Sequence, residues 1–241
     1  MKKTSLVAIL ACCGGLLTGC QTASHAPAEP AAAGTAKTGH GHEPATGISA
    51  EAALARLKAG NERFRGEHLK HPDQGLVRVH ELEAGQHPYA IIVSCSDSRV
   101  PPEIVFDEGL GDLFVVREAG HVADAATLGS VEYAVEHLHA HLVVVLGHEH
   151  CGAVAAASEV ITKNAKPEGH IVNLVDAIRP AVERAKSGQG DLLARAVRAN
   201  VDLVTETLRG SHPILFDHLA EGSVKVVGGV YDLHTGAIEW R

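Results

Sequence analysis

The side chains best suited to chemistry follow short apolar segments of this chain. Cys95, Asp97 and Arg99 come directly after the apolar residues 89–93. Such a segment predicts a short buried strand, which we expect to end near Ser98 because two prolines follow and neither can donate to a sheet. In open α/β sheets, ligands bind at the carboxyl ends of the strands. A thiol, a carboxylate and a guanidinium are therefore expected at a ligand-binding edge.

A second stretch is built in the same way. His148 and Cys151 follow the apolar residues 142–146 and lie three residues apart in a predicted turn, so both can point at one ion. Cys95 would supply a third ligand from a neighbouring strand. Two thiolates and one imidazole favour zinc over magnesium or calcium. Three protein ligands leave one tetrahedral position for water, which is typical of a catalytic zinc, and we expect one Zn²⁺ per chain.

The two motifs together resemble those of the β-class carbonic anhydrases. The motifs are Cys-Ser-Asp-Ser-Arg at 95–99 and Gly-His-Glu-His-Cys-Gly at 147–152. Other segments are similar to family segments and occur in the family's order: 60–64, 85–88, 111–117, 130–134, 229–232 and 235–236. The resemblance covers roughly residues 48–241. It implies reversible, zinc-dependent hydration of carbon dioxide to bicarbonate and a proton.

The resemblance also implies a role for Asp97 and Arg99. Zinc makes a hydroxide from its water near neutral pH, and Asp97 would orient that hydroxide by accepting its hydrogen bond. Arg99 would keep Asp97 ionised through a charge-assisted bond. Two thiolates cancel the charge of Zn²⁺, so the water should be harder to deprotonate than at a three-histidine site. The alternative is a plain surface ion pair.

A pocket for carbon dioxide should be mostly apolar, with one or two hydrogen-bond donors. By motif position, the resemblance assigns this pocket to Gln86, Phe114, Ala119, Tyr133 and the backbone of Gly152. Gln86 and the Gly152 amide would donate to bicarbonate oxygens, and the two aromatic rings would be walls that exclude water. Periodicity alone would place Phe114 and Tyr133 in the core, and that interpretation stays open.

The chain departs from the family at residues 117–121. The usual Arg-Asn-Ala-Gly-Asn is replaced by Arg-Glu-Ala-Gly-His. Glu118 and His121 could therefore alter the pocket rim or the contacts between subunits. His121 and His150 could act as proton shuttles, because histidine titrates near neutrality. With 17 histidines in the chain, coincidence is the favoured interpretation for each.

The N-terminal residues 1–19 predict an export signal. A basic start precedes an apolar stretch, residues 6–17, that is too short to span a membrane. Leu-Thr-Gly-Cys at 17–20 resembles the bacterial lipobox, which implies a lipid anchor on Cys20. The protein would then be an exported lipoprotein on the periplasmic side of the envelope, with Gln21 favouring the outer membrane of Gram-negative cells. An ordinary signal peptide is the alternative.

The predicted processing accounts for all five cysteines. Two leave with the signal and Cys20 is lipidated, so that only Cys95 and Cys151 remain. An even pair in an oxidising compartment can form a disulfide. That pairing would leave His148 without a role, so we favour the zinc site.

Residues 20–47 predict a flexible tether rich in Ala, Pro, Gly and Thr. Residues 48–241 predict one catalytic domain of the α/β class, with a mostly parallel central β-sheet flanked by helices. Strands are expected at 89–93, 113–116, 141–146, 224–231 and 237–240, and helices at 124–139, 153–162, 171–185 and 191–208. Ser49 caps an N-terminal helical arm, and a short helix precedes Gly85. Similar proteins use the arm to clasp a second subunit, which implies a homodimer or higher homo-oligomer.

Charge and motif content bear on the other possible functions. Loss of Lys2 and Lys3 with the signal takes the formal net charge from −8 to −10, which argues against nucleic-acid binding. Hydrolysis of carbonyl sulfide or carbon disulfide occurs on the same fold with the same ligands and stays open. A non-catalytic zinc-binding lipoprotein is the third possibility. The intact Asp97–Arg99 pair speaks against it, because zinc storage does not require that pair.

Overall fold

The computed structural model describes residues 47–241. The predicted signal peptide, the lipidation site Cys20 and nearly all of the predicted tether lie outside the described residues. Within residues 47–241, no helix has the length and apolar character needed to cross a membrane.

Five strands form one sheet in the order β2-β1-β3-β4-β5. Strands β1 (Ala90–Ser94), β2 (Leu113–Arg117), β3 (Leu142–His148) and β4 (Lys225–Tyr231) run parallel to one another. Strand β5 (Ile238–Trp240) pairs antiparallel with β4. The predicted α/β fold with a mostly parallel sheet is confirmed.

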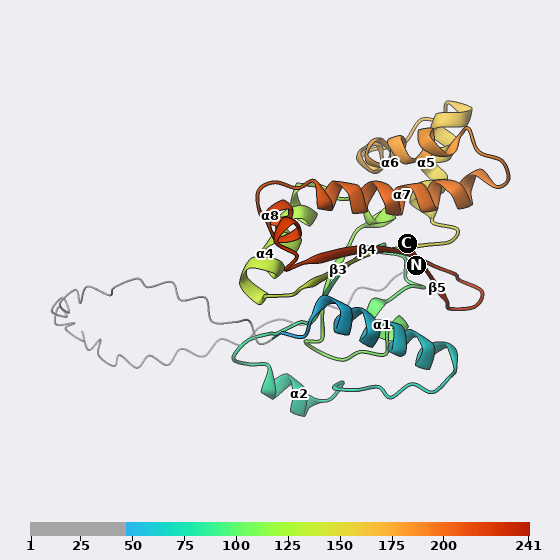
Figure 1. The fold of residues 1–241 in the computed structure, drawn as a ribbon. Helices are drawn as coiled ribbons and strands as arrows, with labels where there is room; N and C mark the ends of the chain where they lie inside the picture. Colours follow the sequence, from blue (N-terminus) through green and yellow to red (C-terminus); the bar gives the residue numbers. More distant parts are fainter. Residues whose placement is uncertain (1–46) are drawn as a thin grey trace, which may run out of the picture. The chain divides into compact units, whose positions relative to one another are not determined.

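Helices cover both faces of the sheet. In Figure 1, α5, α6 and α7 lie on one side of the strands, and α1 and α2 lie on the other. The helices are α1 (Ala50–Arg65), α2 (Leu76–Glu81), α3 (Pro102–Val105), α4 (Ala125–Leu138), α5 (Gly152–Lys163), α6 (Ile171–Ala185), α7 (Leu192–Arg209) and α8 (Ile214–Glu221), with a 3₁₀ turn at Ala119–His121.

Two hydrophobic clusters sandwich the central strands. In β1, Ile91 and Val93 pack into the cluster that contains residues of α4–α8, whereas Ala90 and Ile92 pack into the cluster that contains residues of α1 and α3. Successive side chains of a strand point to opposite faces, and both faces of a parallel sheet are covered. This explains why residues 90–93 of β1 are all apolar. The strands that end at the candidate site are therefore packed on both faces.

The predicted N-terminal helix is present and packs on its own chain. Ser49 Oγ accepts a hydrogen bond from the Ala52 amide (3.2 Å), as the capping pattern predicts. Ala53 and Leu57 of α1 are fully buried in the second cluster. The helix thus covers the sheet of its own subunit, and its predicted contact with a second subunit stays a prediction.

Two element boundaries differ from those expected. β1 ends at Ser94, so Cys95 begins the loop. His148 was expected in a turn, but β3 continues to include it. The strand is longer because Gly147 and His148 pair with Val230 and Tyr231 of β4. The ligating histidine therefore belongs to the rigid sheet.

Candidate metal centre

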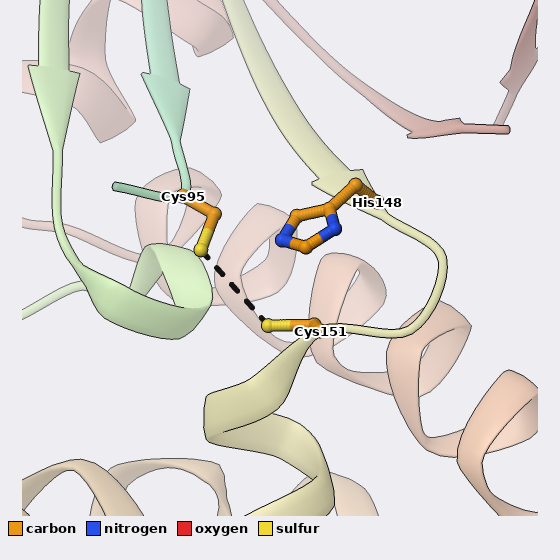
Figure 2. A group of neighbouring side chains, drawn as sticks. All are labelled: Cys95, His148 and Cys151. Carbon is orange, nitrogen blue, oxygen red and sulfur yellow. Dashed lines mark hydrogen bonds between the residues drawn. The ribbon is translucent and has the colours of Figure 1, made fainter. Parts of the chain in front are cut away.

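The structure brings together the three predicted metal ligands. Donor atoms of Cys95, His148 and Cys151 all lie within 4.8 Å of one another, and all three side chains are buried. Figure 2 shows them pointing toward one another from the ends of two strands and the start of a helix. No other group of three such donors occurs within residues 47–241.

The fold places each donor for a local reason. β1 and β3 are parallel neighbours, so their carboxyl ends meet at one edge of the sheet. Cys95 follows the last residue of β1, and His148 is the last residue of β3. Cys151 is the N-cap of α5, where the helix dipole favours a thiolate.

The ring of His148 is oriented for a metal. Its Nδ1 donates to the Glu149 carbonyl (2.8 Å), which leaves the lone pair of Nε2 facing the sulfurs. Nε2 is buried and has no hydrogen-bond partner among the described residues. An unsatisfied buried polar atom costs free energy, and a metal ion would remove that cost. Burial alone would lower the pKa of His148, but contact with the Cys95 thiolate raises it.

The two sulfurs lie 4.0 Å apart as free thiols. A disulfide needs about 2.05 Å, so the disulfide alternative is not what the structure shows. Hydrogen bonding from Cys151 lowers the pKa of the Cys95 thiol, and the Cys95 thiolate in turn raises the pKa of Cys151. A bound cation would remove the remaining proton, because coordinating thiols are deprotonated. Two thiolates and one neutral imidazole fit Zn²⁺.

Asp97 and Arg99 form the predicted ion pair beside the donors. Asp97 Oδ1 accepts from Arg99 Nε (2.9 Å) and Oδ2 accepts from Arg99 Nη2 (2.7 Å). These bonds hold the pKa of the Asp97 carboxyl well below its usual value. Asp97 Oδ2 lies 3.7 Å from His148 Nε2, yet Asp97 is outside the group of mutually close donors. The carboxylate faces the site without completing the donor set.

Arg117 is a site residue that the sequence reasoning missed. From the last position of β2, it donates to the Cys95 carbonyl through Nε (3.0 Å) and to the Asp97 carbonyl through Nη2 (2.7 Å). It thereby fixes the backbone of the loop that carries a ligand and the Asp97 carboxylate. The available signal was a guanidinium at the end of an apolar strand, next to the Cys95 loop.

Two predicted pocket residues lie at the metal centre. Ala119 belongs to the turn whose next residue, Gly120, donates its amide to Cys95 Sγ (3.3 Å). Gly152 is the first residue of α5, directly after Cys151. Their backbone groups can therefore line the space beside the three donors.

The other three predicted pocket residues lie elsewhere on the same chain. Phe114 pairs with Ile91, four residues before Cys95, which corresponds to roughly 13 Å along the strand. Tyr133 of α4 is 48% exposed, and its ring centroid lies 6.3 Å from that of Phe114. Gln86 is exposed before β1. One subunit alone does not bring this aromatic pair to its own metal centre.

The residues that depart from the family pattern have different surroundings. His121 is fully buried, and burial lowers its pKa to about 4, so it is uncharged at neutral pH and has no contact with solvent. His150 is exposed in the loop between His148 and Cys151. Burial raises the pKa of Glu118, whose backbone continues the pairing of β2 with the Cys95 loop.

Comparisons with known proteins agree on one family. A family model described as "Carbonic anhydrase" matches residues 90–238. The chain is 45% identical to carbonic anhydrase 2 of Mycobacterium tuberculosis over 188 residues, which is 77% of this chain and 89% of that protein. It is 41% identical to the carbonic anhydrase of Mycolicibacterium smegmatis, over 79% of this chain and 92% of that protein.

Solved structures are similar in fold. The β-carbonic anhydrase CcaA is 28% identical with a TM-score of 0.60, over 78% of this chain and 94% of that chain. The β-carbonic anhydrase CafA of Aspergillus fumigatus is 28% identical with a TM-score of 0.58, over 79% and 89% of the two chains.

Proposed function

Because the chain belongs to the β-class carbonic anhydrases, we propose that Asp97, held by Arg99, orients the attacking water in the hydration of carbon dioxide. The enzyme is a carbonic anhydrase and uses zinc, which fits the Cys95–His148–Cys151 donor set. When bound there, zinc supplies a hydroxide near neutral pH by acidifying water. The chain's own side chains and backbone amides would orient the water and bind the substrate.

One contact carries the proposal for Asp97. Its Oδ2 lies 3.7 Å from His148 Nε2, so a carboxylate oxygen faces the space into which the three donors point. The two-point bond from Arg99 and the lowered pKa keep this carboxylate ionised, and an ionised carboxylate can only accept hydrogen bonds. It therefore binds an O–H group and turns the lone pairs of that oxygen toward carbon dioxide.

The backbone around the donors has further roles in the proposed site. The amide of Gly152, at the N-terminus of α5, is available to donate to a bicarbonate oxygen. Ala119 directly precedes Gly120, whose amide donates to Cys95 Sγ, and its small apolar side chain would suit an apolar substrate. Arg117 holds both Cys95 and Asp97 through their carbonyls, so ligand and carboxylate keep a fixed separation.

A second copy of the chain would complete the pocket. β2 pairs with β1 on one side and with no described strand on the other, and its apolar residues are only half-buried. An unpaired apolar edge is a template for strand pairing, and twofold symmetry makes two β2 strands antiparallel. The Phe114 end of one strand then meets the Arg117 end of the other, beside its Cys95 loop. This supports a homodimer or higher homo-oligomer whose walls, Phe114 and Tyr133, serve the other subunit.

Subunit mixing tests this composite pocket. Cys151→Ala removes a metal ligand, and Phe114→Ala removes a wall. If each pocket uses both chains, a hybrid dimer has one complete site, and a random mixture should regain about a quarter of native activity. A mixture no more active than its two parents would rule out the shared pocket.

The membrane anchor belongs to the same proposal. The Leu-Thr-Gly-Cys sequence at 17–20 supports lipidation of Cys20, export, and attachment at the periplasmic side of the envelope, with the outer membrane favoured in Gram-negative cells. The tether of residues 20–47 would then separate the domain from the lipid surface. Bicarbonate or carbon dioxide outside the cytoplasm would be the substrate at this position.

Substrate preference is tested on the purified protein. We expect about one zinc per chain and hydration of carbon dioxide by stopped flow, with little turnover of carbonyl sulfide or carbon disulfide. Faster turnover of either sulfur compound at the same zinc content would reassign the substrate. Stoichiometric zinc without turnover of any of the three would indicate a non-catalytic zinc-binding protein.

A further inference from the structure

The turn beside Cys95 has an unusual backbone. Gly120 and His121 both have positive φ angles, 73° and 44°, which are costly for histidine. A Cβ at Gly120 would lie 2.6 Å from Ile178 Cδ1, so the turn is closely packed. Its geometry directs the Gly120 amide at Cys95 Sγ, at 3.3 Å. Something in the surroundings must hold the turn in this conformation.

Asn200 of α7 is bonded to both residues of that turn. Its Nδ2 donates to the Gly120 carbonyl (2.8 Å) and to His121 Nε2 (3.0 Å). The two hydrogens of the amide group serve the two acceptors, and the opposite orientation would set Oδ1 against the Gly120 carbonyl oxygen. His121 Nε2 is therefore an acceptor, and its ring carries the hydrogen on Nδ1. Both side chains are buried, Asn200 at 1% exposure and His121 at 0%.

We propose that Asn200 and His121 are positioning residues for the metal ligand Cys95. They hold the Gly120 turn so that its N–H donates to the Cys95 sulfur. A hydrogen bond to a thiolate withdraws negative charge from the sulfur and weakens its donation to zinc. At a centre with two thiolates, this keeps more positive charge on the metal. The inference depends on the zinc site and is independent of the role of Asp97.

Asn61 offers a matched control for a purely structural role. It is also a buried asparagine, 3% exposed, and its Nδ2 also bridges two segments, at the Val105 carbonyl (3.2 Å) and the Gly236 carbonyl (2.9 Å). It packs against α3 and the β4–β5 turn and makes no contact with a metal ligand. Loss of either asparagine removes two hydrogen bonds made by a buried side chain.

The test compares Asn200→Ala with Asn61→Ala in the full-length protein. Zinc affinity is measured by competition with a chromophoric chelator, and the thiolate-to-metal charge-transfer band is recorded with Co²⁺ as probe. We expect Asn200→Ala to bind zinc about 10–100-fold more weakly, because the Gly120 amide no longer holds the Cys95 sulfur in position. We expect the charge-transfer band to shift to longer wavelength, because a sulfur without that hydrogen bond releases charge to the metal more readily. We expect Asn61→Ala to melt at a lower temperature with native affinity and band position. Equal affinity and equal band position in the two variants would overturn the proposal.

A measurement on the unsubstituted protein covers the case in which Asn200→Ala does not fold. In protein loaded with ¹¹³Cd, a hydrogen bond to a coordinated sulfur produces scalar coupling between the metal and the amide proton. We expect this coupling at the Gly120 amide. Its absence from the native protein would refute the proposal, whatever the variants show.

Discussion

At the scale of single residues, the charge of the ligands sets how acidic a metal-bound water can be. Two thiolates cancel the charge of Zn²⁺, which makes the metal a weaker acid than one held by three neutral imidazoles. The chain surrounds the site with groups that offset this effect or fix geometry. In the proposed mechanism Asp97 supplies an acceptor. Gly120 donates to the Cys95 sulfur, and Arg117 donates to the carbonyls of both Cys95 and Asp97.

The ligand set predicts metal loss on substitution. Cys95→Ala and Cys151→Ala each remove one of three protein donors, so each variant should lose most of its zinc. The control Ser96→Ala changes an exposed side chain of the same loop and should keep about one zinc per chain. Metal analysis after dialysis is the measurement. Full occupancy in both cysteine variants would contradict the assignment of the ligands.

Arg117 provides a second prediction at this scale. Arg117→Lys keeps the charge but loses the rigid fork that reaches two carbonyls. We expect zinc affinity or activity to fall by about 10-fold or more, as for other groups that orient metal ligands. Arg209→Lys is the control, because Arg209 donates to a single carbonyl, that of Val226 (2.7 Å). Equal losses in both variants would show that Arg117 has no special link to the site.

Residue types and spacing predicted the donors, but not the groups that hold them. The sequence allowed the three donors Cys95, His148 and Cys151 to be assigned to one site, because they lie in two motifs that each follow a recognisable apolar segment. Asn200 lies 80 residues from the turn that it holds, in the middle of a helix. Its spacing from Val197 and Val204 places it on the apolar face of α7, but the local pattern does not show its hydrogen-bond partners, because these are set by how α7 packs on the sheet.

At the scale of elements, ion pairs between arginines of α1 and buried carboxylates attach this helix to the body of the domain. Asp107, 2% exposed, pairs with Arg63 of α1 and accepts the amides of Lys70 and His71, both at 3.0 Å. Arg56 of α1 pairs with the buried Glu108 and also with Asp112. These contacts, with Ala53 and Leu57, hold the helix on its own sheet.

Asp107→Asn should therefore destabilise the domain. We expect the free energy of unfolding to fall by about 1.5–3 kcal/mol at pH 7, the range for hydrogen bonds to a charged group. The control Asp176→Asn breaks an exposed pair with Arg179 and should cost less than about 1 kcal/mol. Urea unfolding measures the stability of both variants. Equal losses of unfolding free energy would show that the buried Asp107 contributes no more than an exposed ion pair.

The same pair predicts how stability depends on pH. Burial would raise the pKa of Asp107, but the bonds from Arg63 and from the two amides outweigh it, so the folded pKa lies below the unfolded value. The stabilisation is therefore full above the unfolded value, about pH 4, and is lost as the pH falls through the folded pKa. The difference in unfolding free energy between native protein and Asp107→Asn should shrink below about pH 4. If the difference in unfolding free energy between the two proteins instead grew on acidification, the pKa of Asp107 would have to be raised on folding, contrary to this prediction.

The order of the strands could not be predicted from the pattern. All five strands and the longer helices appear where periodicity placed them, because burial on both faces leaves unbroken apolar segments. The order β2-β1-β3-β4-β5 depends on packing between distant segments. Two short helices were not predicted: α3 has only four residues and begins at Pro102, and α8 has eight residues.

At the scale of the whole molecule, the lipobox-like residues 17–20 predict an enzyme anchored to a membrane. Cys20→Ser removes the sulfur that would carry lipid, so a membrane-associated protein should become soluble after export, or should keep its signal. Fractionation of cells that produce each form measures this. Cys13→Ser, which changes a cysteine outside the lipobox, is the control. Membrane partitioning of the Cys20→Ser protein equal to that of native protein would contradict the anchor.

The role of Asp97 is the central claim, and a pH profile of carbon dioxide hydration tests it most directly. Arg99 keeps Asp97 ionised well below neutrality, so the native rise of activity with pH, expected above about pH 7, should report the acidity of the two-thiolate site. Asp97→Asn offers a donor where an acceptor is needed. We predict native zinc content and an activity about 10²–10⁴-fold lower across the profile, the range for a lost general-base or orienting group. An Asn variant within a fewfold of native activity at high pH and matched zinc content would show that Asp97 does not orient the reaction.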